Sequence, residues 1–400
     1  MNPPLLSTAI GRIAPSPTAA MTDRATQLRQ AGRDVVSLSV GEPDLATPAH
    51  VVAAVKQALD QGQTNYTPVG GTAAMKRAAM LHFRRDLGIA TGYDNVTVSA
   101  GGKQAIFHAL MATLDPGDEV LIPAPWWVSY PEIVAFAGGR VVPMRTGAQD
   151  GFRIDPEQLA RAITPRSRWL LLNSPANPTG AVYSTQDLSM LAKIIEDHPR
   201  LLVMSDDIYA PWRYDEMPHA TLAALRPDLA DRILTVSGVS KSHAMTGFRI
   251  GVAAGPEWLI RAMESLQSHS SGNPCSISQA GAVAAFEGSQ DFLREWRDIY
   301  HRRRDRVVQQ VNATDGLATP APAGAFYCLV DAALHVGAGR RWSDDQALAL
   351  HLLDHGVAVV PASAFGAAHC GLSGFRISFA ADEALMDEAL ARIASALEQP

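Results

Sequence analysis

The chain has 400 residues, longer than one typical domain of about 150 residues, and this length predicts two or three domains. Hydrophobic residues make up 47% and charged residues 18%, so we expect a globular protein with a large core. The net charge of −6, without a basic block, gives no reason to expect nucleic acid or an anionic membrane surface as a partner.

The three cysteines, Cys275, Cys328 and Cys370, are too few and too far apart for a disulfide scaffold or a Cys-x-x-Cys metal site. We therefore expect no metal centre and a cytoplasmic location. The first residues lack a basic segment followed by a long apolar one, so a signal peptide is not expected. Two stretches without acidic or basic residues, near 265–286 and 356–375, are rich in Ser, Gly, His or Pro and are not expected to span a membrane.

Short apolar runs alternate with amphipathic stretches through the middle of the chain. The expected strands are residues 95–99, 119–123, 140–143, 168–173, 201–205 and 233–237. Helices are expected between them, for example over 102–114 and over 185–198, the second opened by a capping-type Ser-Thr-Gln-Asp. Buried strands separated by helices predict an α/β fold with a mostly parallel sheet.

The last third of the chain predicts a different arrangement. A long helical segment over 278–311 is expected to bridge two domains. Short strands at 326–330, 357–360 and 375–379 and a final helix at 382–397 are expected after it. We therefore expect a large domain over residues 49–290 and a smaller α+β domain made of residues 1–48 and 291–400.

The candidate chemistry follows the predicted strands, because open α/β sheets bind ligands beyond the carboxyl ends of their strands. Gly101, Gly102 and Lys103 follow the strand at 95–99 and open a helix, where backbone N–H groups can bind an anion. A cation at a helix start is disfavoured by roughly 0.3–1 kcal/mol, so Lys103 suggests that an anionic ligand lies nearby. A plain tight turn would explain the same residues.

The next strand ends carry an amide, an acid, a phenol and a lysine. Asn177 lies in Ser-Pro-Ala-Asn-Pro-Thr-Gly, Asp206 and Tyr209 follow the next strand, and Lys241 and Arg249 follow the one after it. The segment around Asn177 could be an ordinary turn, and Asp206 could be an ordinary helix cap. A lysine behind a buried strand has a lowered pKa and becomes nucleophilic, and an arginine suits a phosphate. Together these residues fit pyridoxal 5′-phosphate (PLP), which needs a Schiff-base lysine and an anionic partner for its pyridine nitrogen.

In these motifs the chain resembles the class I aminotransferases of the aspartate aminotransferase superfamily, PLP fold type I. The matching segments, which occur in the family's order between Ser37 and Ala380, are SLSVGEPD, NYTPVGG, GGKQA, NSPANPTG, SDDIY, SGVSKSHAMTGFRIG and FRISFA. The resemblance implies a large PLP-binding domain with a smaller α+β domain, and a homodimer with shared active sites that acts on amino acids and 2-oxo acids.

The resemblance also implies a role for each matching residue. Lys241 would form the Schiff base with the cofactor and move a proton between the substrate Cα and the cofactor C4′. Asp206 would pair with the protonated pyridine nitrogen. Tyr209 and Asn177 would hydrogen-bond the phenolic oxygen of the cofactor, and Trp127 would stack on its ring.

Further matching residues are implied to bind the phosphate and the substrate. The resemblance implies that the cofactor phosphate is bound by Gly101, Gly102, Lys103, Ser240 and Arg249. Those implied at the substrate are Gly41, Lys103, Trp127, Asn177 and Arg376, of which Arg376 would clamp the α-carboxylate. Tyr66 would reach the phosphate of the neighbouring subunit.

The motifs GGKQA and PWWVSYPE are similar to those of a bacterial subgroup that includes aspartate and prephenate aminotransferases. In that subgroup the lysine after the glycines, here Lys103, binds the distal carboxylate of the substrate. We therefore expect a dicarboxylic donor such as aspartate or glutamate, with 2-oxoglutarate as acceptor. Ala14 stands where relatives often carry a lysine, which weakens a prephenate assignment, and SKSHAMTG is also similar to enzymes for basic amino acids.

Several alternatives therefore stay open at this point. Aromatic, prephenate and basic amino acids are alternative substrates, and a PLP-dependent lyase would use the same Lys241 and Asp206. Arg376 and the complete NPTG segment favour transamination. A regulatory protein with an aminotransferase-like domain is disfavoured because the resemblance begins near residue 10. Asp207 departs from the family's commoner Glu, and Ser237 from its commoner Asn.

Overall fold

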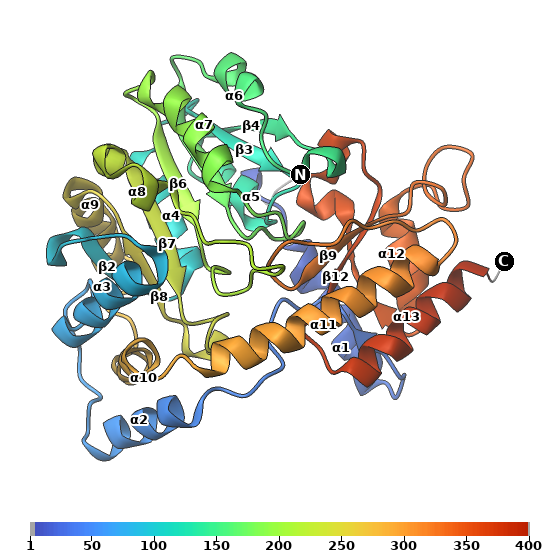
Figure 1. Cartoon of the computed structure of the whole chain (residues 1–400), viewed down its shortest axis with the longest axis horizontal. Helices are drawn as coiled ribbons and strands as arrows, with labels where there is room; N and C mark the ends of the chain where they lie inside the picture. Colours follow the sequence, from blue (N-terminus) through green and yellow to red (C-terminus); the bar gives the residue numbers. More distant parts are fainter. Residues whose placement is uncertain (1–4, 399–400) are drawn as a thin grey trace.

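The computed structural model describes residues 5–398, and within them the chain forms an α/β fold built on three sheets (Figure 1). The largest sheet has seven strands in the order β2-β8-β7-β6-β5-β3-β4. Its strands are β2 (Val96–Ser99), β3 (Glu119–Ala124), β4 (Arg140–Arg145), β5 (Ser167–Asn173), β6 (Leu202–Asp206), β7 (Ile233–Gly238) and β8 (Gly251–Ala254).

The mostly parallel sheet predicted from the sequence is confirmed. Neighbouring strands from β4 to β7 pair in parallel, and each of the six predicted strands is present. The sequence reading missed β8, which lies antiparallel between β2 and β7. Its four residues, Gly-Val-Ala-Ala, are small and few, so they carry little of the β-branched pattern that marks a strand.

Helices cover both faces of this sheet. They are α3 (Ala73–Leu87), α4 (Gly102–Thr113), α5 (Ser129–Phe136), α6 (Pro156–Ala162), α7 (Thr185–Glu196), α8 (Leu222–Leu225), α9 (Glu257–Ser268) and α10 (Ser276–Glu287). Helix α2 (Ala49–Asp60) packs on the outside of α10. Strand β5 shows why two layers form, because Trp169 and Leu171 join the core under α4 and α9, whereas Leu170 and Leu172 join the core under α6 and α7.

The rest of the described chain forms a second layered unit. Its strands are β1 (Val36–Ser37), β9 (Tyr327–Asp331), β10 (Val357–Ala358), β11 (Val360–Pro361) and β12 (Gly374–Ser378). Its helices are α1 (Pro17–Gln30), α11 (Phe292–Ala313), α12 (Asp345–Asp354) and α13 (Glu383–Glu398). One hydrophobic core joins N-terminal Val35 and Val36 to C-terminal residues such as Phe375 and Ile393.

This core agrees with a small domain made from both ends of the chain, although the boundaries 1–48, 49–290 and 291–400 stay a prediction. Residues 1–4 and 399–400, which the prediction includes, lie outside the described residues. Short 3₁₀ turns complete the fold at Ile10–Arg12, Tyr93–Asn95, Ala148–Asp150, Pro227–Arg232, Thr246–Phe248, Ala362–Phe365 and Ala367–Cys370. No helix within residues 5–398 has the length and apolar character needed to cross a membrane.

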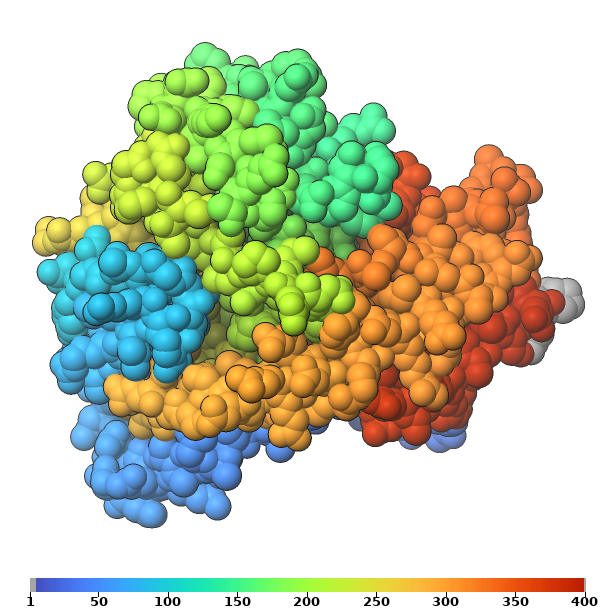
Figure 2. Space-filling view, viewed as in Figure 1, coloured from blue at the N-terminus to red at the C-terminus, as the bar shows by residue number. Residues whose placement is uncertain are grey.

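Two predicted elements differ in the structure. The helix expected over 278–311 is two helices, because Gly288 adopts an extended conformation with ψ of 179° after α10, and α11 begins only at Phe292. The strand expected over 357–360 is split into β10 and β11, which pair in different sheets. Helix α11 passes along the face of the molecule toward the C-terminal elements, where its orange surface lies between the yellow-green and red regions (Figure 2).

Candidate active site

A cavity of about 480 Å³ lies at the carboxyl ends of the parallel strands. Of the thirteen residues singled out in the sequence, eleven line it, from both structural units: Gly41, Gly102, Lys103, Trp127, Asn177, Asp206, Tyr209, Ser240, Lys241, Arg249 and Arg376. Gly101 and Tyr66 do not line it. The position of the cavity therefore follows the rule that places ligands beyond the strand ends of open α/β sheets.

Lys241 lies three residues after the end of β7, and its Nζ donates a hydrogen bond of 2.5 Å to the carbonyl oxygen of Gly41. Burial lowers the pKa of Lys241 to about 8, and the nearby Arg249 and Arg376 act in the same direction. The carboxylates of Glu42 and Asp206 act in the opposite direction. The amine is therefore much closer to losing its proton at neutral pH than an exposed lysine.

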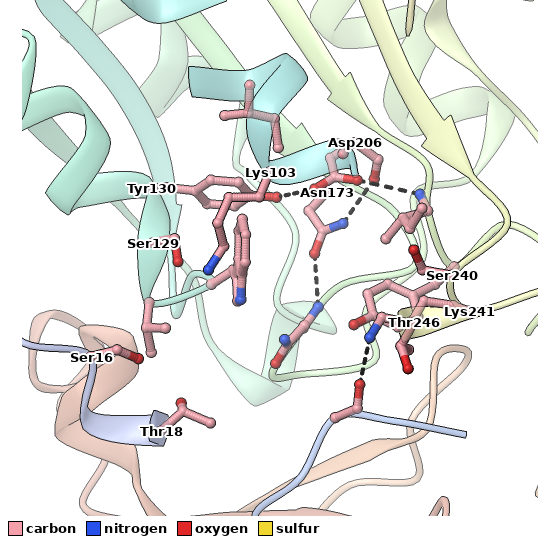
Figure 3. Close-up of a pocket in the computed structure, with 18 of the residues that line it drawn as sticks. Ser16, Thr18, Lys103, Ser129, Tyr130, Asn173, Asp206, Ser240, Lys241 and Thr246 are labelled. Carbon is pink, nitrogen blue, oxygen red and sulfur yellow. Dashed lines mark hydrogen bonds between the residues drawn. The ribbon is translucent and has the colours of Figure 1, made fainter. Parts of the chain in front are cut away.

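Asp206 is the buried last residue of β6. Its Oδ2 accepts a hydrogen bond of 2.7 Å from the hydroxyl of Tyr130, and its Oδ1 accepts one of 3.3 Å from the backbone N–H of Ile208. Asn173 Nδ2 donates to the backbone oxygen of Asp206 at 2.8 Å (Figure 3). Burial raises the pKa of Asp206 to about 6, against the opposing effects of Tyr130, of the Ile208 N–H and of Lys241.

The turn between β2 and α4 forms a cradle against Arg249. Gly101 has a φ of +93°, and a Cβ at this position would collide with the guanidinium of Arg249. That guanidinium donates to the backbone oxygens of Thr246 at 3.0 Å and Ala100 at 3.3 Å, not to a carboxylate. Backbone N–H groups at the start of α4 and a guanidinium held by carbonyls together suit an anion.

Lys103 lies in the first turn of α4, with its ammonium 4.9 Å from the ring centre of Trp127. It makes no ion pair with any described residue. Burial, followed by repulsion from Arg249, lowers its pKa. Lys103 is therefore a cation at a helix start without an ion-pair partner among residues 5–398, and the anionic ligand expected near it stays a prediction.

Arg376, on β12, is almost fully buried at 2% exposure. It donates to Asn177 Oδ1 at 3.0 Å and to the backbone oxygen of Ser39 at 2.5 Å. Its guanidinium packs against the rings of Tyr327 and Phe365, at 4.5 and 4.9 Å from the ring centres. Its Nε has no hydrogen-bond partner within the described chain. A buried guanidinium without a carboxylate partner is suited to an anionic ligand.

Several residues of the cavity were not singled out in the sequence. Ser16 and Thr18 of the α1 segment line the wall that faces Lys103, and Tyr130 and Asn173 hydrogen-bond Asp206 (Figure 3). Thr22 of α1 lines the cavity as well. Ser16 gives a local signal only as the N-cap of α1, where its side chain accepts from the N–H of Ala19. Nothing in that segment indicates contact with residues a hundred positions away.

Tyr66 is 98% exposed, so it contributes nothing to the cavity of its own chain. Gly101 stands directly behind the cavity as the residue before α4. Tyr209 lies in the cavity wall, and its hydroxyl hydrogen-bonds that of Tyr327 at 2.8 Å. Trp127 meets the ring of Tyr130 edge-to-face at 5.2 Å between ring centres.

With this fold and this cavity, the chain belongs to the aminotransferase class I and II family, whose model matches residues 33–393. It is therefore a transaminase, as the motifs predicted.

Among its curated relatives, an aspartate/prephenate aminotransferase of Cereibacter sphaeroides is 47% identical over 97% of both chains. An aspartate aminotransferase of Rhizobium meliloti is 47% identical over 94% of this chain and 92% of its own. The crystal structure of an aspartate aminotransferase from Rhizobium meliloti superposes with a TM-score of 0.92 at 46% identity, covering 98% of both chains. That of the Thermus thermophilus aspartate aminotransferase with maleate gives 0.91 at 41% identity, covering 98% of this chain and 99% of the other.

Proposed function

We propose that this transaminase uses PLP to move the amino group of a dicarboxylic amino acid, aspartate or glutamate, to a 2-oxo acid such as 2-oxoglutarate. One observation carries the proposal: a single cavity contains a lysine of lowered pKa, a buried aspartate and two guanidinium groups, Arg249 and Arg376, that bind no carboxylate of the described chain. A cofactor phosphate and a substrate α-carboxylate would be the anionic partners of these two guanidinium groups.

The residues present fit PLP. The helix start at Gly102, the hydroxyl of Ser240 and the guanidinium of Arg249 would hold its phosphate, with Gly101 leaving the room that a Cβ would fill. Asp206 would accept from the ring nitrogen and Trp127 would cover the ring. Tyr209 and Asn177 would donate to the phenolic oxygen. When bound, PLP supplies an electron sink for the electrons released at the substrate Cα.

The side chains of this protein supply binding and proton transfer. Arg376, held by Asn177, would bind the substrate α-carboxylate through two parallel N–H groups and so orient the Cα–H bond. Lys241 would anchor the cofactor and then, as a free amine, take the proton from the substrate Cα at Nζ. Its pKa of about 8 keeps part of the amine unprotonated near neutral pH.

The dicarboxylate preference rests on Lys103. Its ammonium faces the cavity without an acidic partner, and Ser16 and Thr18 stand on the opposite wall (Figure 3). A distal carboxylate would receive a charge-assisted hydrogen bond there. The relatives named for aspartate support this choice, as does the Thermus structure, because maleate is a dicarboxylate.

Prephenate is a second candidate substrate, because the relative from Cereibacter sphaeroides is named for both aspartate and prephenate. The prephenate assignment is weakened by Ala14, because a lysine is common at this position in relatives. Ala14 offers the site no cationic side chain, and its backbone N–H donates to Glu132 Oε2 at 2.7 Å. Aromatic or basic donors, and less favoured lyase chemistry, are the remaining alternatives.

We also propose a homodimer with shared sites, located in the cytoplasm. Tyr66 is an exposed tyrosine without a role in its own chain. An apolar hollow, lined by Ile13, Phe107, Ile133 and Phe136, adjoins Lys103 and Arg249 and would receive part of a second copy. Three separate free thiols support a reducing compartment.

A panel of amino donors tests the substrate proposal. Each donor is added to the PLP-loaded enzyme without an acceptor, and the cofactor band near ~420 nm is followed toward ~330 nm, values that are a rough guide for this cofactor class. Aspartate and glutamate should convert the band most efficiently. Conversion by basic or aromatic donors alone would replace the dicarboxylate proposal, and release of a 2-oxo acid with ammonia would indicate a lyase.

A further inference from the structure

Tyr130 is a buried phenol in the first turn of α5 that was not singled out in the sequence. Its side chain is 1% exposed, and its hydroxyl donates to Asp206 Oδ2 at 2.7 Å (Figure 3). Burial, with the adjacent charge of Asp206, raises the pKa of this phenol well above its ordinary value. The hydroxyl therefore keeps its proton at every physiological pH and acts toward Asp206 as a donor only.

Asp206 has few other groups that favour its charged form. The N–H of Ile208 is a longer donor at 3.3 Å, and Lys241 is the cation that acts on it. The neighbouring Asp207 is buried too; it accepts from Ser205 Oγ at 3.0 Å and has one oxygen without a partner in the described chain. Burial raises its pKa to about 8, and repulsion from Asp206 adds to this effect.

Two adjacent buried carboxyl groups cannot both be charged without strong repulsion. Burial and repulsion raise the pKa of Asp207 more than that of Asp206, so the negative charge of the pair is favoured on Asp206. The short bond from Tyr130 is the side-chain hydrogen bond that favours the charge on Asp206, with Ile208 N–H and Lys241 acting in the same direction. The charged form of Asp207 is favoured by the Ser205 hydroxyl and by Arg213. The second titratable phenol near this pair, Tyr209, hydrogen-bonds Tyr327 instead.

We propose that Tyr130 is a positioning residue that holds the Asp206 carboxylate charged and fixed in orientation, so that it can accept from the protonated ring nitrogen of the cofactor. This role rests on the proposed use of PLP. The same Tyr130 ring supports Trp127 edge-to-face, so one side chain sets both the acid and the indole that would contact the cofactor. Removing only the hydroxyl separates the two effects, because phenylalanine keeps the ring.

The variant Y130F tests this role through two measurements that do not depend on catalysis, the titration of Asp206 and the affinity for PLP. In the full-length apoenzyme labelled with ¹³C at aspartate carboxyls, the Asp206 signal is assigned by its loss in D206N and titrated by NMR. We expect its midpoint to rise by about one pH unit in Y130F, as expected for the loss of one hydrogen bond to a charged group. PLP affinity, from tryptophan fluorescence, should fall about twofold near pH 7 and up to about tenfold near pH 5, and it should recover near pH 9, where Asp206 is charged in both proteins.

Y183F is the matched control, because Tyr183 is also buried and its hydroxyl accepts from the N–H of Ile154 instead of donating to Asp206. It should leave the Asp206 titration and the PLP affinity unchanged. An Asp206 midpoint in Y130F equal to that of the wild type would overturn the role of Tyr130. If the wild type itself fails to bind PLP, the proposed function fails, and the NMR titration still decides whether Tyr130 controls Asp206.

Discussion

At the scale of single residues, the site combines ionisable side chains whose charged forms are destabilised by burial. Lys241, Asp206 and Arg376 come from three separate segments, and burial shifts the pKa of each toward its neutral form. None forms an ion pair with another described residue within 4.0 Å. Their charges are therefore available to ligands, which explains why the cavity suits a cofactor and substrate that bring anionic groups and a protonated nitrogen.

The lowered pKa of Lys241 predicts the pH dependence of cofactor attachment. The reactive form is the neutral amine, so the rate at which the apoenzyme takes up PLP covalently should rise with pH and level off above about 8. Stopped-flow absorbance between roughly pH 6 and 10 measures this profile. A rate that keeps rising through pH 10 would show that Lys241 titrates like an exposed lysine.

The dicarboxylate proposal assigns the second carboxylate of the substrate to Lys103. A charge-assisted contact in a closed site contributes roughly 1.5–3 kcal/mol, so Lys103→Ala should lower kcat/KM for aspartate and glutamate by about 10- to 150-fold. Alanine or phenylalanine as donor should be almost unaffected, because neither presents a group to Lys103.

Steady-state kinetics with both donor classes, together with the PLP affinity of the variant, separates two roles of Lys103. An equal loss for charged and uncharged donors would mean that Lys103 serves the phosphate or the fold. The dicarboxylate proposal would then lose its main support.

At the scale of elements, the turn between β2 and α4 is the most demanding local structure of the site. Gly101 combines a φ of +93° with a side-chain position already filled by Arg249. Gly101→Ala should therefore displace the guanidinium and weaken PLP binding by about 5- to 30-fold, on the order of 1–2 kcal/mol.

Gly32→Ala is the matched control, because Gly32 has a φ of +83° with no atom within 4 Å of the added Cβ. This variant should suffer only the cost of placing a residue with a Cβ at a positive φ. It should therefore lower thermal stability without changing PLP affinity. Fluorescence titration and thermal unfolding of both variants check this. Equal PLP affinities for the two variants would mean that Arg249 tolerates the methyl group.

The elements also show what the sequence predicts and what it does not. The strands and the residues that follow them were predicted well, because each depends on a local run of apolar residues and on the rule for strand ends. The junction at Gly288 was missed because the helical pattern continues on both sides of it. Ser16, Thr18 and Tyr130 were missed for another reason, since their contacts join segments that lie far apart in the sequence.

At the scale of the whole molecule, residues from both structural units form one cavity. Gly41 and Arg376 come from the unit built by the two chain ends, and Lys241 and Asp206 from the large sheet. The bidentate pair of Arg303 with Asp44, at 2.8 and 2.9 Å, ties α11 to the loop that carries Gly41. A shift of one unit against the other would therefore change the site directly.

The proposed shared sites predict recovery of activity in mixed dimers. In the proposed dimer, each site takes Lys241 from one subunit and Tyr66 from the other. A hybrid of a Lys241→Ala subunit and a Tyr66→Ala subunit therefore has both changes in one site and none in the other, which stays intact. After subunit exchange by mild denaturation, an equal mixture should recover up to about a quarter of wild-type activity for a two-fold dimer. Mixing Lys241→Ala with Asp206→Asn is the control and should recover none, because both residues belong to the same chain's cavity. Equal behaviour of the two mixtures would contradict shared sites.

The most direct test of the central claim, that this cavity carries PLP on Lys241, is borohydride reduction of the PLP-loaded enzyme followed by peptide mapping. Reduction makes the bond between lysine and cofactor permanent, so the labelled peptide reports the attachment point. We predict one labelled peptide, the one containing Lys241, and no label in Lys241→Ala. Specific label at any other lysine, or none in the wild type, would contradict the account.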